Sequence, residues 1–415
     1  MSPLEGLAGF ARGSFCYIAL PLLAFVSLAC YICRQRGEQA QAQTNEKQAG
    51  GKAREQLIHP ARLPTAGQSE NASNIMPSTR PRCNTWSATS MTTGGGPILT
   101  RSRRDYTVGF ICALPIELAT IKAMLDETHA DLPASIFDDN NYTLGRMCSH
   151  NVVITCLPTG KYGPISAATV AIRMLLTFRS IRFGLMVGIG GGVPNRRRDI
   201  RLGDVVVSKP TKNSPGVFQC DMDFKCTGTL NKPPYVLLNA LSRIQANHIL
   251  NARRIPEFLA KMRKEYPSMR DRVTPTEADN LFLAQYEHPG PKGSCRQCNK
   301  SFLMPRPQRR LGPDNPEIHY GPIASVTQVV RDGNLRDRLA LRLKNLCFEM
   351  EAAGLMDSFP CLVIRGISDY ADSHKNDHWK GYAAATAAAY AKELLSVIPP
   401  EEVENEQLIP QLPRL

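Results

Sequence analysis

The sequence lacks the regular cysteine spacing of a disulfide-stabilised scaffold. It has 13 cysteines, an odd number, and several lie inside apolar segments that resemble strands, such as Cys112, Cys156 and Cys361. Thiols in this arrangement are typical of a reducing compartment. We therefore expect reduced cysteines and a cytosolic location for most of the chain.

The sequence also lacks a Walker phosphate-binding loop, because Gly-Lys-Ser or Gly-Lys-Thr follows neither of its glycine runs. The run at Gly190–Gly192 leads into "VPNRRRDIRLGD" and not directly into a helix, so it is a poor dinucleotide-binding fingerprint. These glycines either permit a tight turn or let a small ligand approach the backbone at Gly190 and Gly191.

Basic residues outnumber acidic ones and give a formal net charge of +13, but they are not concentrated in one motif. Arg101, Arg103, Arg104 and the run at 196–198 lie in segments expected to be linkers or loops. Scattered charge of this kind is typical of a solvated surface, so we infer no nucleic-acid partner.

An uncharged segment, Ser14 to Cys33, follows a short N-terminal tail at 1–13. Its length of about 20 residues, at about 1.5 Å each, matches a bilayer core of about 30 Å. Because Arg34 and Arg36 follow it, the positive-inside rule predicts a single-pass signal anchor with the remaining chain in the cytosol. A cleaved signal peptide is the rival interpretation, and a mis-assigned start would make the protein wholly cytosolic.

Residues 34–104 are rich in Gln, Ala, Thr, Ser, Pro and Gly and show no lasting apolar period, which predicts a disordered linker. We expect one folded domain at 105–398, with an irregular insert at about 252–318, followed by a tail at 399–415.

Apolar strand-like segments alternate with helical periodicity through the expected domain. Strands are expected in 106–115, 151–157, 181–192, 204–208 and 361–368, and helices in 116–127, 165–178, 332–344 and 382–398. This order predicts an α/β fold with a central mixed β-sheet flanked by helices. Ligands in such folds bind at the carboxyl ends of strands, where Glu117, Gly160, Gly190, Ser368 and Asp369 are placed.

The segment Leu346 to Met356, "LCFEMEAAGLM", places Glu349 and Glu351 in apolar surroundings and looks like the start of a buried helix. Acidic side chains are rarely buried without partners. The pair could simply favour a helix N-terminus, or it could belong to a site.

Four motifs in order resemble the nucleoside phosphorylase/nucleosidase superfamily: "CALPIELATIKAML", "VGIGGGVP" with "RLGDVVVS", "CFEMEAAGLM" and "IRGISDYADS". The resemblance covers about 106–398. It is closest to fungal nucleoside-phosphorylase-like domains often fused to signalling or repeat modules, and it extends to methylthioadenosine/S-adenosylhomocysteine nucleosidases. It implies a phosphorylase/hydrolase-like fold and an enzyme that cleaves the N-glycosidic bond of a purine nucleoside or nucleotide, with neither a metal nor a cofactor.

The resemblance also implies residue roles on the sugar side. Glu351 would hold the ribose hydroxyls, Met350 would pack on the sugar, and Glu349 would help to fix that corner.

On the base side, the resemblance implies that Asp369 protonates or hydrogen-bonds purine N7, with Ser368 in support. The backbone around Val329 and Val330 would face the base, and Glu117 would position the attacking water. A carboxylate near the sugar stabilises its developing positive charge, and an acid near N7 neutralises the leaving base.

Two points favour water over phosphate as the nucleophile. The third-strand position reads "MVGIGGG", without the arginine and Ser/Thr turn of related phosphorylases, and Glu117 stands where nucleosidases have a water-activating residue. A phosphorylase stays an alternative, because the loop with Gly160, Lys161 and Ser166 could hold phosphate, or the 5′-phosphates of a nucleotide.

A catalytically weak nucleoside-binding or sensor module is a further alternative. Val326 stands where relatives have a small residue, and the segment at about 219–232 looks shorter than its counterpart, which could close over the substrate. Self-association into a homo-oligomer is compatible with the sequence.

The insert contains Cys295-x-x-Cys298, with His288 before it and His319 after it. A CxxC motif supplies two ligands of a tetrahedral zinc site. Because no second CxxC follows, the sequence favours reduced cysteines or a redox pair over zinc, and we expect no metal.

Overall fold

The structure is a computed structural model in which residues 101–409 are described, except 196, 222, 291, 292, 310, 311 and 313. The expected membrane segment at 14–33 and most of the expected linker lie outside the described residues. In the described part of the chain, no helix is both long enough and apolar enough to cross a bilayer.

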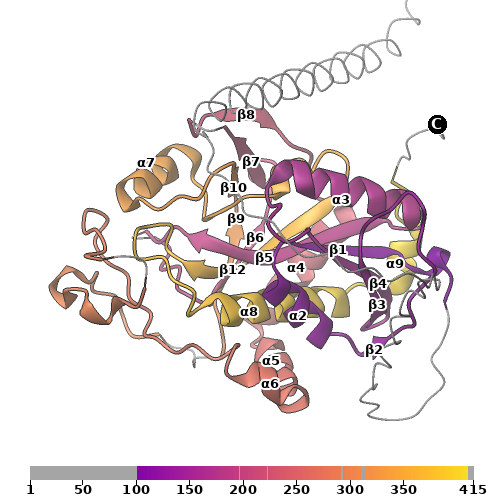
Figure 1. The fold of residues 1–415 in the computed structure, drawn as a ribbon, viewed down its shortest axis with the longest axis horizontal. Coiled ribbons are helices and arrows are strands. Elements are labelled where there is room, and N and C mark those ends of the chain that lie inside the picture. The colour runs from indigo at the N-terminus through magenta and orange to yellow at the C-terminus, as the bar shows by residue number, and fades with distance from the viewer. Residues whose placement is uncertain are drawn as a thin grey trace, which may run out of the picture. The chain divides into compact units, whose positions relative to one another are not determined.

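The described residues form a 12-stranded mixed sheet with helices on both faces (Figure 1). The strands are β1 (Val108–Cys112), β2 (Glu127–Thr128), β3 (Tyr142–Met147), β4 (His150–Cys156), β5 (Phe183–Gly192), β6 (Val205–Ser208), β7 (Val217–Cys220), β8 (Cys226–Thr229), β9 (Ile318–Gly321), β10 (Ile323–Val326), β11 (Cys347–Glu349) and β12 (Cys361–Asp369). The α-helices are α2 (Pro115–Ala123), α3 (Pro164–Thr177), α4 (Tyr235–Ile249), α5 (Ile255–Glu265), α6 (Pro267–Arg270), α7 (Gly333–Leu343), α8 (Lys380–Ser396) and α9 (Pro400–Asn405). Short 3-10 helices are η1 (Arg103–Asp105), η2 (Cys295–Gln297), η3 (Lys300–Phe302) and η4 (Ala352–Gly354).

The centre of the sheet is parallel and runs in the order β4, β1, β5 and β12. Every residue of β1 and β12 is buried, which explains why these strands read as continuous apolar runs. Their carboxyl ends meet at one edge of the sheet, and this is where the predicted site residues gather.

Side chains of the central strands alternate between two cores. On β1, Val108, Phe110 and Cys112 enter the core shared with α2, α4, α5 and α8, whereas Ile111 enters the core shared with α3. This alternation follows from the two-residue period of a strand. The expected α/β architecture is therefore present in the described residues.

Helix α8 lies directly against β12. A Cβ placed at Gly366 would lie 1.8 Å from the Ala383 carbonyl oxygen, so only glycine permits this approach. The small alanine side chains of α8 complete the contact, and the helix is buried from Gly381 to Leu395.

The expectation of a helix at Leu346 to Met356 is wrong. Residues Cys347–Glu349 form strand β11, which pairs with β10 in parallel and with β5 in antiparallel fashion, and only the short η4 follows. Backbone pairing on two sides outweighs the local helical propensity of this segment.

The glycine run at Gly190–Gly192 is the end of β5 and not a turn after it. A Cβ at Gly190 would lie 2.9 Å from the Phe348 carbonyl oxygen, and one at Gly191 would lie 2.9 Å from Asp369 Oδ1. These glycines therefore let β11 and Asp369 approach the strand.

The segment at about 219–232, which the sequence suggested as a shortened loop, includes the end of β7 and all of β8. These two strands pair in antiparallel fashion, and β7 also pairs with β10.

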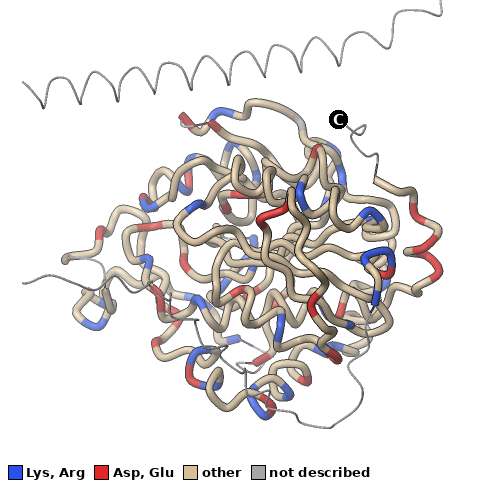
Figure 2. Tube along the Cα trace, turned by 45° about the vertical axis from the view of Figure 1, so that its right-hand side comes forward, with Lys and Arg blue, Asp and Glu red and all other residues tan. Residues whose placement is uncertain are grey.

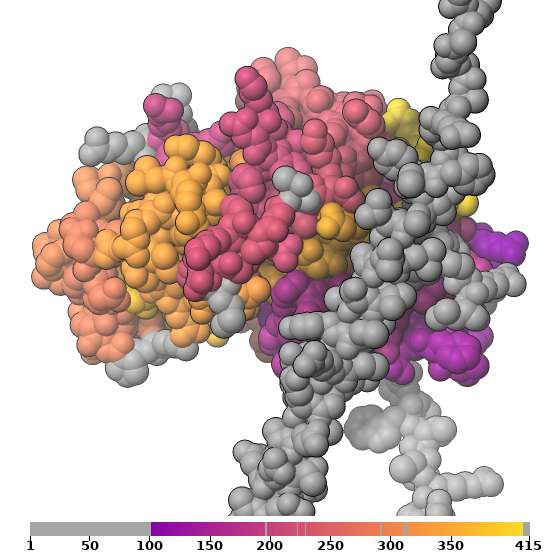
Figure 3. Space-filling view, turned by 90° about the horizontal axis from the view of Figure 1, so that it is seen from above, coloured from indigo at the N-terminus to yellow at the C-terminus, as the bar shows by residue number. Residues whose placement is uncertain are grey.

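The part of the insert that follows α6 lies at the same end of the described domain as helix α7 (Figures 1 and 3), whereas α5 and α6 lie below α8 in Figure 1. Figure 2 shows basic and acidic residues interspersed along the described chain, in keeping with charge spread over a solvated surface.

Candidate functional site

A cavity of about 270 Å³ opens at the carboxyl ends of the central strands. It is lined by Ala113, Leu114, Glu117, Tyr162, Ile189, Gly190, Gly191, Val326, Gln328, Val329, Val330, Phe348, Glu349, Met350, Glu351, Arg365, Ser368, Asp369, Ala371, Lys375 and Lys380. The structure thus brings together residues from six separate stretches of the chain, as the strand order predicted. Gly160 and Ser166 were predicted to bind substrate or phosphate, but they do not line this cavity.

The loop before α3 reaches the cavity through other residues. Tyr162 lines it, and the backbone N–H of Gly163 donates a hydrogen bond to Glu351. Gly160 has a φ of 81°, and a Cβ there would find nothing within 4 Å, so this position faces open space. The loop therefore contributes an aromatic wall and one amide.

Glu117 is buried in the first turn of α2. Its Oε2 accepts hydrogen bonds from the N–H groups of Ala113 and Leu114, both at 2.8 Å, and its Oε1 accepts one from Ile189 at 2.7 Å. Burial raises the pKa of Glu117, whereas Arg365 and these three amides oppose the rise. The side chain caps its helix and also links β1, α2 and β5 at the cavity wall.

Arg365 is one of the site residues that were not predicted from the sequence motifs. It lies within β12, is only 1% exposed, and its guanidinium pairs with Glu349 and lies 3.6 Å from Glu351 Oε2. It also lies 3.5 Å from the Ile189 carbonyl oxygen. An arginine inside the apolar run "CLVIRGIS" was the available signal, because a buried charge requires buried partners.

Glu349 and Glu351 have different surroundings. Glu349 accepts hydrogen bonds from the N–H groups of Glu351 and Ala352, at 3.0 and 2.9 Å, in addition to its ion pair with Arg365. It therefore fixes the turn after β11. Its carboxylate is more fully engaged than that of Glu351.

Glu351 keeps part of its carboxylate available to the cavity. Burial, reinforced by Glu349 and Glu117, raises the pKa of Glu351 to about 7, although Arg365 and the Gly163 amide oppose this rise. A carboxylate with a pKa in this range can accept hydrogen bonds from hydroxyl groups and can exchange a proton near neutral pH.

Asp369 is the last residue of β12 and also lines the cavity. Its Oδ2 accepts hydrogen bonds from Ser368 Oγ at 2.8 Å and from Lys375 Nζ at 2.5 Å. Its Oδ1 accepts one from the N–H of Ala371 at 3.0 Å, where the backbone has a φ of 52°. The positive φ marks a tight turn that directs Asp369 inward. Lys375 was not predicted from the sequence.

Apolar side chains form the wall between these groups. Val326 and Val330 are buried and pack in one cluster with Phe348 and Ala371, whereas Val329 is 41% exposed. This wall can accept a flat apolar ring.

The charged groups are distributed unevenly along the cavity wall. Three carboxylates, those of Glu117, Glu349 and Glu351, surround the single guanidinium of Arg365, so this part of the wall suits a positive charge on a bound group. Asp369, with the Lys375 ammonium, faces a different part of the cavity.

The sequence profile of the Phosphorylase superfamily matches residues 107–398. A nucleotide-binding leucine-rich repeat (NLR)-like protein of Hyaloscypha variabilis is 44% identical over 312 residues, which are 74% of this chain and 30% of that relative. This chain thus spans less than a third of that relative's length. A 5′-methylthioadenosine/S-adenosylhomocysteine nucleosidase of Mycobacterium tuberculosis is 27% identical, with 71% of this chain and 97% of the relative covered.

A shorter match, 38% identical over 79 residues, is to the ATP nucleosidase Cap17 of Escherichia coli, and it covers 18% of this chain and 16% of that relative. A crystal structure of 5′-methylthioadenosine/S-adenosylhomocysteine nucleosidase from Neisseria meningitidis aligns with a TM-score of 0.44 at 15% identity, covering 70% of this chain and 98% of that one. The superfamily resemblance of the sequence motifs is confirmed by the profile match. The chain therefore belongs to the phosphorylase superfamily.

Proposed function

We propose that this protein hydrolyses the N-glycosidic bond of a purine nucleoside or nucleotide. The observation that carries the proposal is the placement of Glu351 and Asp369 in one cavity, with Glu117 and Arg365 in the wall beside Glu351. Two acidic groups on separate parts of the cavity match the two charges that develop when a ribose–purine bond breaks.

In the proposed reaction, Glu351 accepts hydrogen bonds from the ribose hydroxyls and its charge stabilises the cationic sugar. The electron pair of the breaking bond passes to the purine, and Asp369 in its protonated form donates a proton to N7. Water, positioned by Glu117, bonds to the sugar carbon and passes a proton to the Glu117 carboxylate. The products are the free base and the free sugar.

Water is favoured over phosphate as the nucleophile, because the cations of the cavity wall are already paired with carboxylates. Arg365, Lys375 and Lys380 are the cationic residues among the described residues that line the cavity, and each pairs with a carboxylate. An inorganic phosphate would have to displace one of these ion pairs. Phosphorolysis is the alternative, and it predicts ribose-1-phosphate as the product.

The relatives suggest which substrates to test. One relative is named for methylthioadenosine and S-adenosylhomocysteine and another for ATP. The full-length protein should be incubated with adenosine, inosine, guanosine, methylthioadenosine and ATP, each with and without phosphate, and the base and sugar products separated by chromatography. Free sugar without phosphate supports hydrolysis, and a phosphate-dependent sugar phosphate contradicts it.

A nucleoside-binding module with weak catalysis is a second candidate, because the ion pair with Lys375 occupies the carboxylate of Asp369. Saturable nucleoside binding without base release from any of these substrates would favour this candidate and would refute the enzymatic proposal.

We also propose that residues 14–33 anchor the protein in a membrane as a single-pass segment, with the domain on the cytosolic side. The support is the uncharged 14–33 segment and the arginines after it. Recovery of the full-length protein in the soluble fraction at low salt would contradict this anchor.

A further inference from the structure

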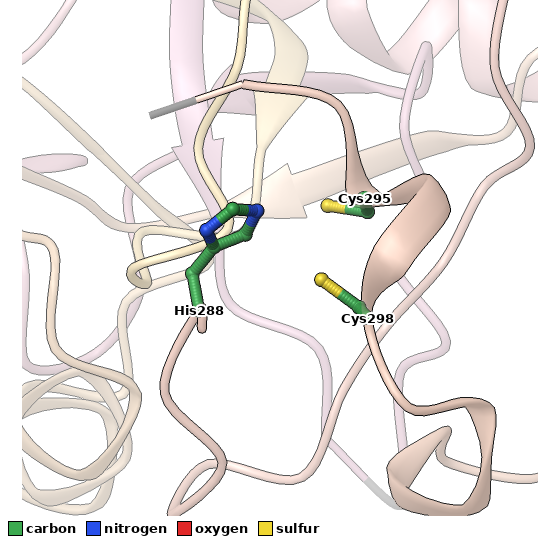
Figure 4. Close-up of side chains that lie close together, drawn as sticks. All are labelled: His288, Cys295 and Cys298. Atoms are coloured by element: carbon green, nitrogen blue, oxygen red, sulfur yellow. The ribbon is translucent and has the colours of Figure 1, made fainter. Parts of the chain in front are cut away.

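Three metal-ligating side chains of the insert lie together in a part of the fold that the proposed reaction does not use. These residues are His288, Cys295 and Cys298, and one ligand atom from each lies within 4.8 Å of the other two (Figure 4). We propose that they bind a divalent transition-metal ion of the zinc class, through the two Sγ atoms and the Nε2 atom of His288.

The spacing of the ligand atoms suits such an ion. In a tetrahedral site with Zn–S of about 2.3 Å and Zn–N of about 2.0 Å, ligand atoms are about 3.5–3.8 Å apart. Figure 4 shows the two thiols on one side and the imidazole on the other, all pointing toward a common centre. Small movements of the side chains bring the three atoms to coordination distance.

The hydrogen bonds of His288 leave its Nε2 atom, the proposed metal ligand, available. Its Nδ1 lies 3.0 Å from the Gly290 carbonyl oxygen, whereas the Gly290 amide is farther away, at 3.4 Å. A protonated Nδ1 that donates to this carbonyl makes Nε2 the unprotonated ligand, which is the usual arrangement of a metal-bound histidine. Nε2 is buried and has no hydrogen-bond partner among the described residues.

The surroundings of the cysteines also fit a metal site. Cys295 and Cys298 are 9% and 5% exposed and flank η2, the 3-10 turn that brings their thiols to the same side. The Asn376 side-chain amide lies 4.0 Å from Cys295 Sγ, a sulfur hydrogen bond of the kind that supports a thiolate ligand. Two thiolates and one neutral imidazole balance the charge of a divalent ion.

A second histidine, His374, lies beside these ligands, although its ring nitrogens are outside the group of ligand atoms that lie within 4.8 Å of one another. The ring of His374 is centred 5.4 Å from that of His288, and both of its ring nitrogens are buried without a hydrogen-bond partner in the described chain. His374 stacks on Phe282 at 4.2 Å between ring centres, which holds it next to the insert. Four-coordinate zinc sites use such combinations of Cys and His.

The site would hold together the part of the insert that packs on the loop after β12. The N–H of His288 donates to Ser373 Oγ at 3.0 Å, and a small cavity is lined by both Cys295 and Asp369. Lys375, in the same loop, pairs with Asp369. A metal ion at the insert would therefore stabilise the segment that holds the Asp369–Lys375 pair, without taking part in a chemical step.

The full-length protein, purified under reducing conditions without a polyhistidine tag, should contain stoichiometric zinc by elemental mass spectrometry. Cys295→Ser and His288→Ala should lose the metal, whereas Cys226→Ser, a substitution at an exposed cysteine, should retain it. Metal-free wild-type protein, or a Cys295→Ser variant with full metal content, would overturn the proposal.

A measurement on the wild-type protein covers the case in which the variants do not fold. Exchange of the bound metal for cobalt(II) should produce thiolate-to-cobalt charge-transfer absorption, and a chelator should abolish it and lower the thermal unfolding midpoint. Absence of this absorption, or a Cys295–Cys298 disulfide found by mass spectrometry in the reduced preparation, would refute metal binding and indicate a redox pair.

Discussion

The guanidinium of Arg365 lies 3.6 Å from Glu351 Oε2 and forms a closer ion pair with Glu349. One buried cation is thus shared between two glutamates, while Glu117 contributes a third negative charge to the surroundings of the guanidinium. This relationship explains how several acidic groups coexist in the interior, and why the region around Glu351 stays electrostatically suited to a cationic sugar.

Replacement of Arg365 by Met should destabilise the fold strongly. The change leaves Glu349 and Glu351 buried without their cation, and such losses cost about 3–5 kcal/mol in the free energy of unfolding. Urea denaturation followed by circular dichroism measures the effect. Arg243→Met is the matched control, because Arg243 is exposed and contacts only a backbone carbonyl among the described residues. Equal stabilities of the two variants would contradict the shared ion pair.

Replacement of Asp369 by Asn should reduce base release by about 10²–10⁴-fold, the usual contribution of a general acid. Asn can still accept the hydrogen bond from the Ala371 amide through Oδ1, and its NH2 group can donate to Ser368 Oγ. Lys375 is 26% exposed, so the loss of its partner is partly compensated by water. The unfolding midpoint should therefore change little. Asp271→Asn serves as the control, since Asp271 is exposed and does not line the cavity. Unchanged base release in Asp369→Asn would remove Asp369 from the reaction.

Glu351 should make the stability of the protein depend on pH. Its pKa is raised from 4.5 to about 7 by burial, so the folded protein binds this proton more tightly than the unfolded chain does. The contribution of Glu351 to the free energy of unfolding is therefore full below about pH 4.5 and declines as the pH rises toward about 7.

The measurement is denaturant unfolding across this pH range for the wild type, Glu351→Gln and Glu402→Gln. The slope of the free energy of unfolding against pH should flatten in Glu351→Gln only, because Glu402 is exposed in α9 and should not contribute to it. A slope that is the same in all three proteins would show that Glu351 titrates normally.

Replacement of Gly366 by Ala should destabilise the packing of α8 on the sheet. The new Cβ would lie 1.8 Å from the Ala383 carbonyl oxygen, and such overpacking costs about 1–3 kcal/mol or more. Gly228→Ala is the control, because a Cβ there meets nothing within 4 Å. Thermal unfolding should separate the variants, and equal midpoints would mean that α8 can shift without cost.

The sequence by itself determined the α/β architecture and about half of the residues that line the cavity. Buried parallel strands appear as mostly apolar runs, which made β1, β5 and β12 recognisable. Glu117 follows β1, β5 ends in glycines and β12 ends in Asp369, so each carboxyl end leads to a predicted site position. Helix α7 was recognisable from its apolar period, and its Asp332 cap accepts from the Asn334 and Leu335 amides.

Only the tertiary structure decided the features that depend on distant partners. Cys347–Glu349 is a strand because β5 and β10 supply hydrogen bonds on both sides, a fact absent from its local sequence. Arg365 acquires its role from glutamates that precede it by 14 and 16 residues in the chain but touch it in space. The proximity of His288 to Cys295 and Cys298 likewise arises from the path of the insert, because irregular segments carry no periodic signal that predicts their contacts.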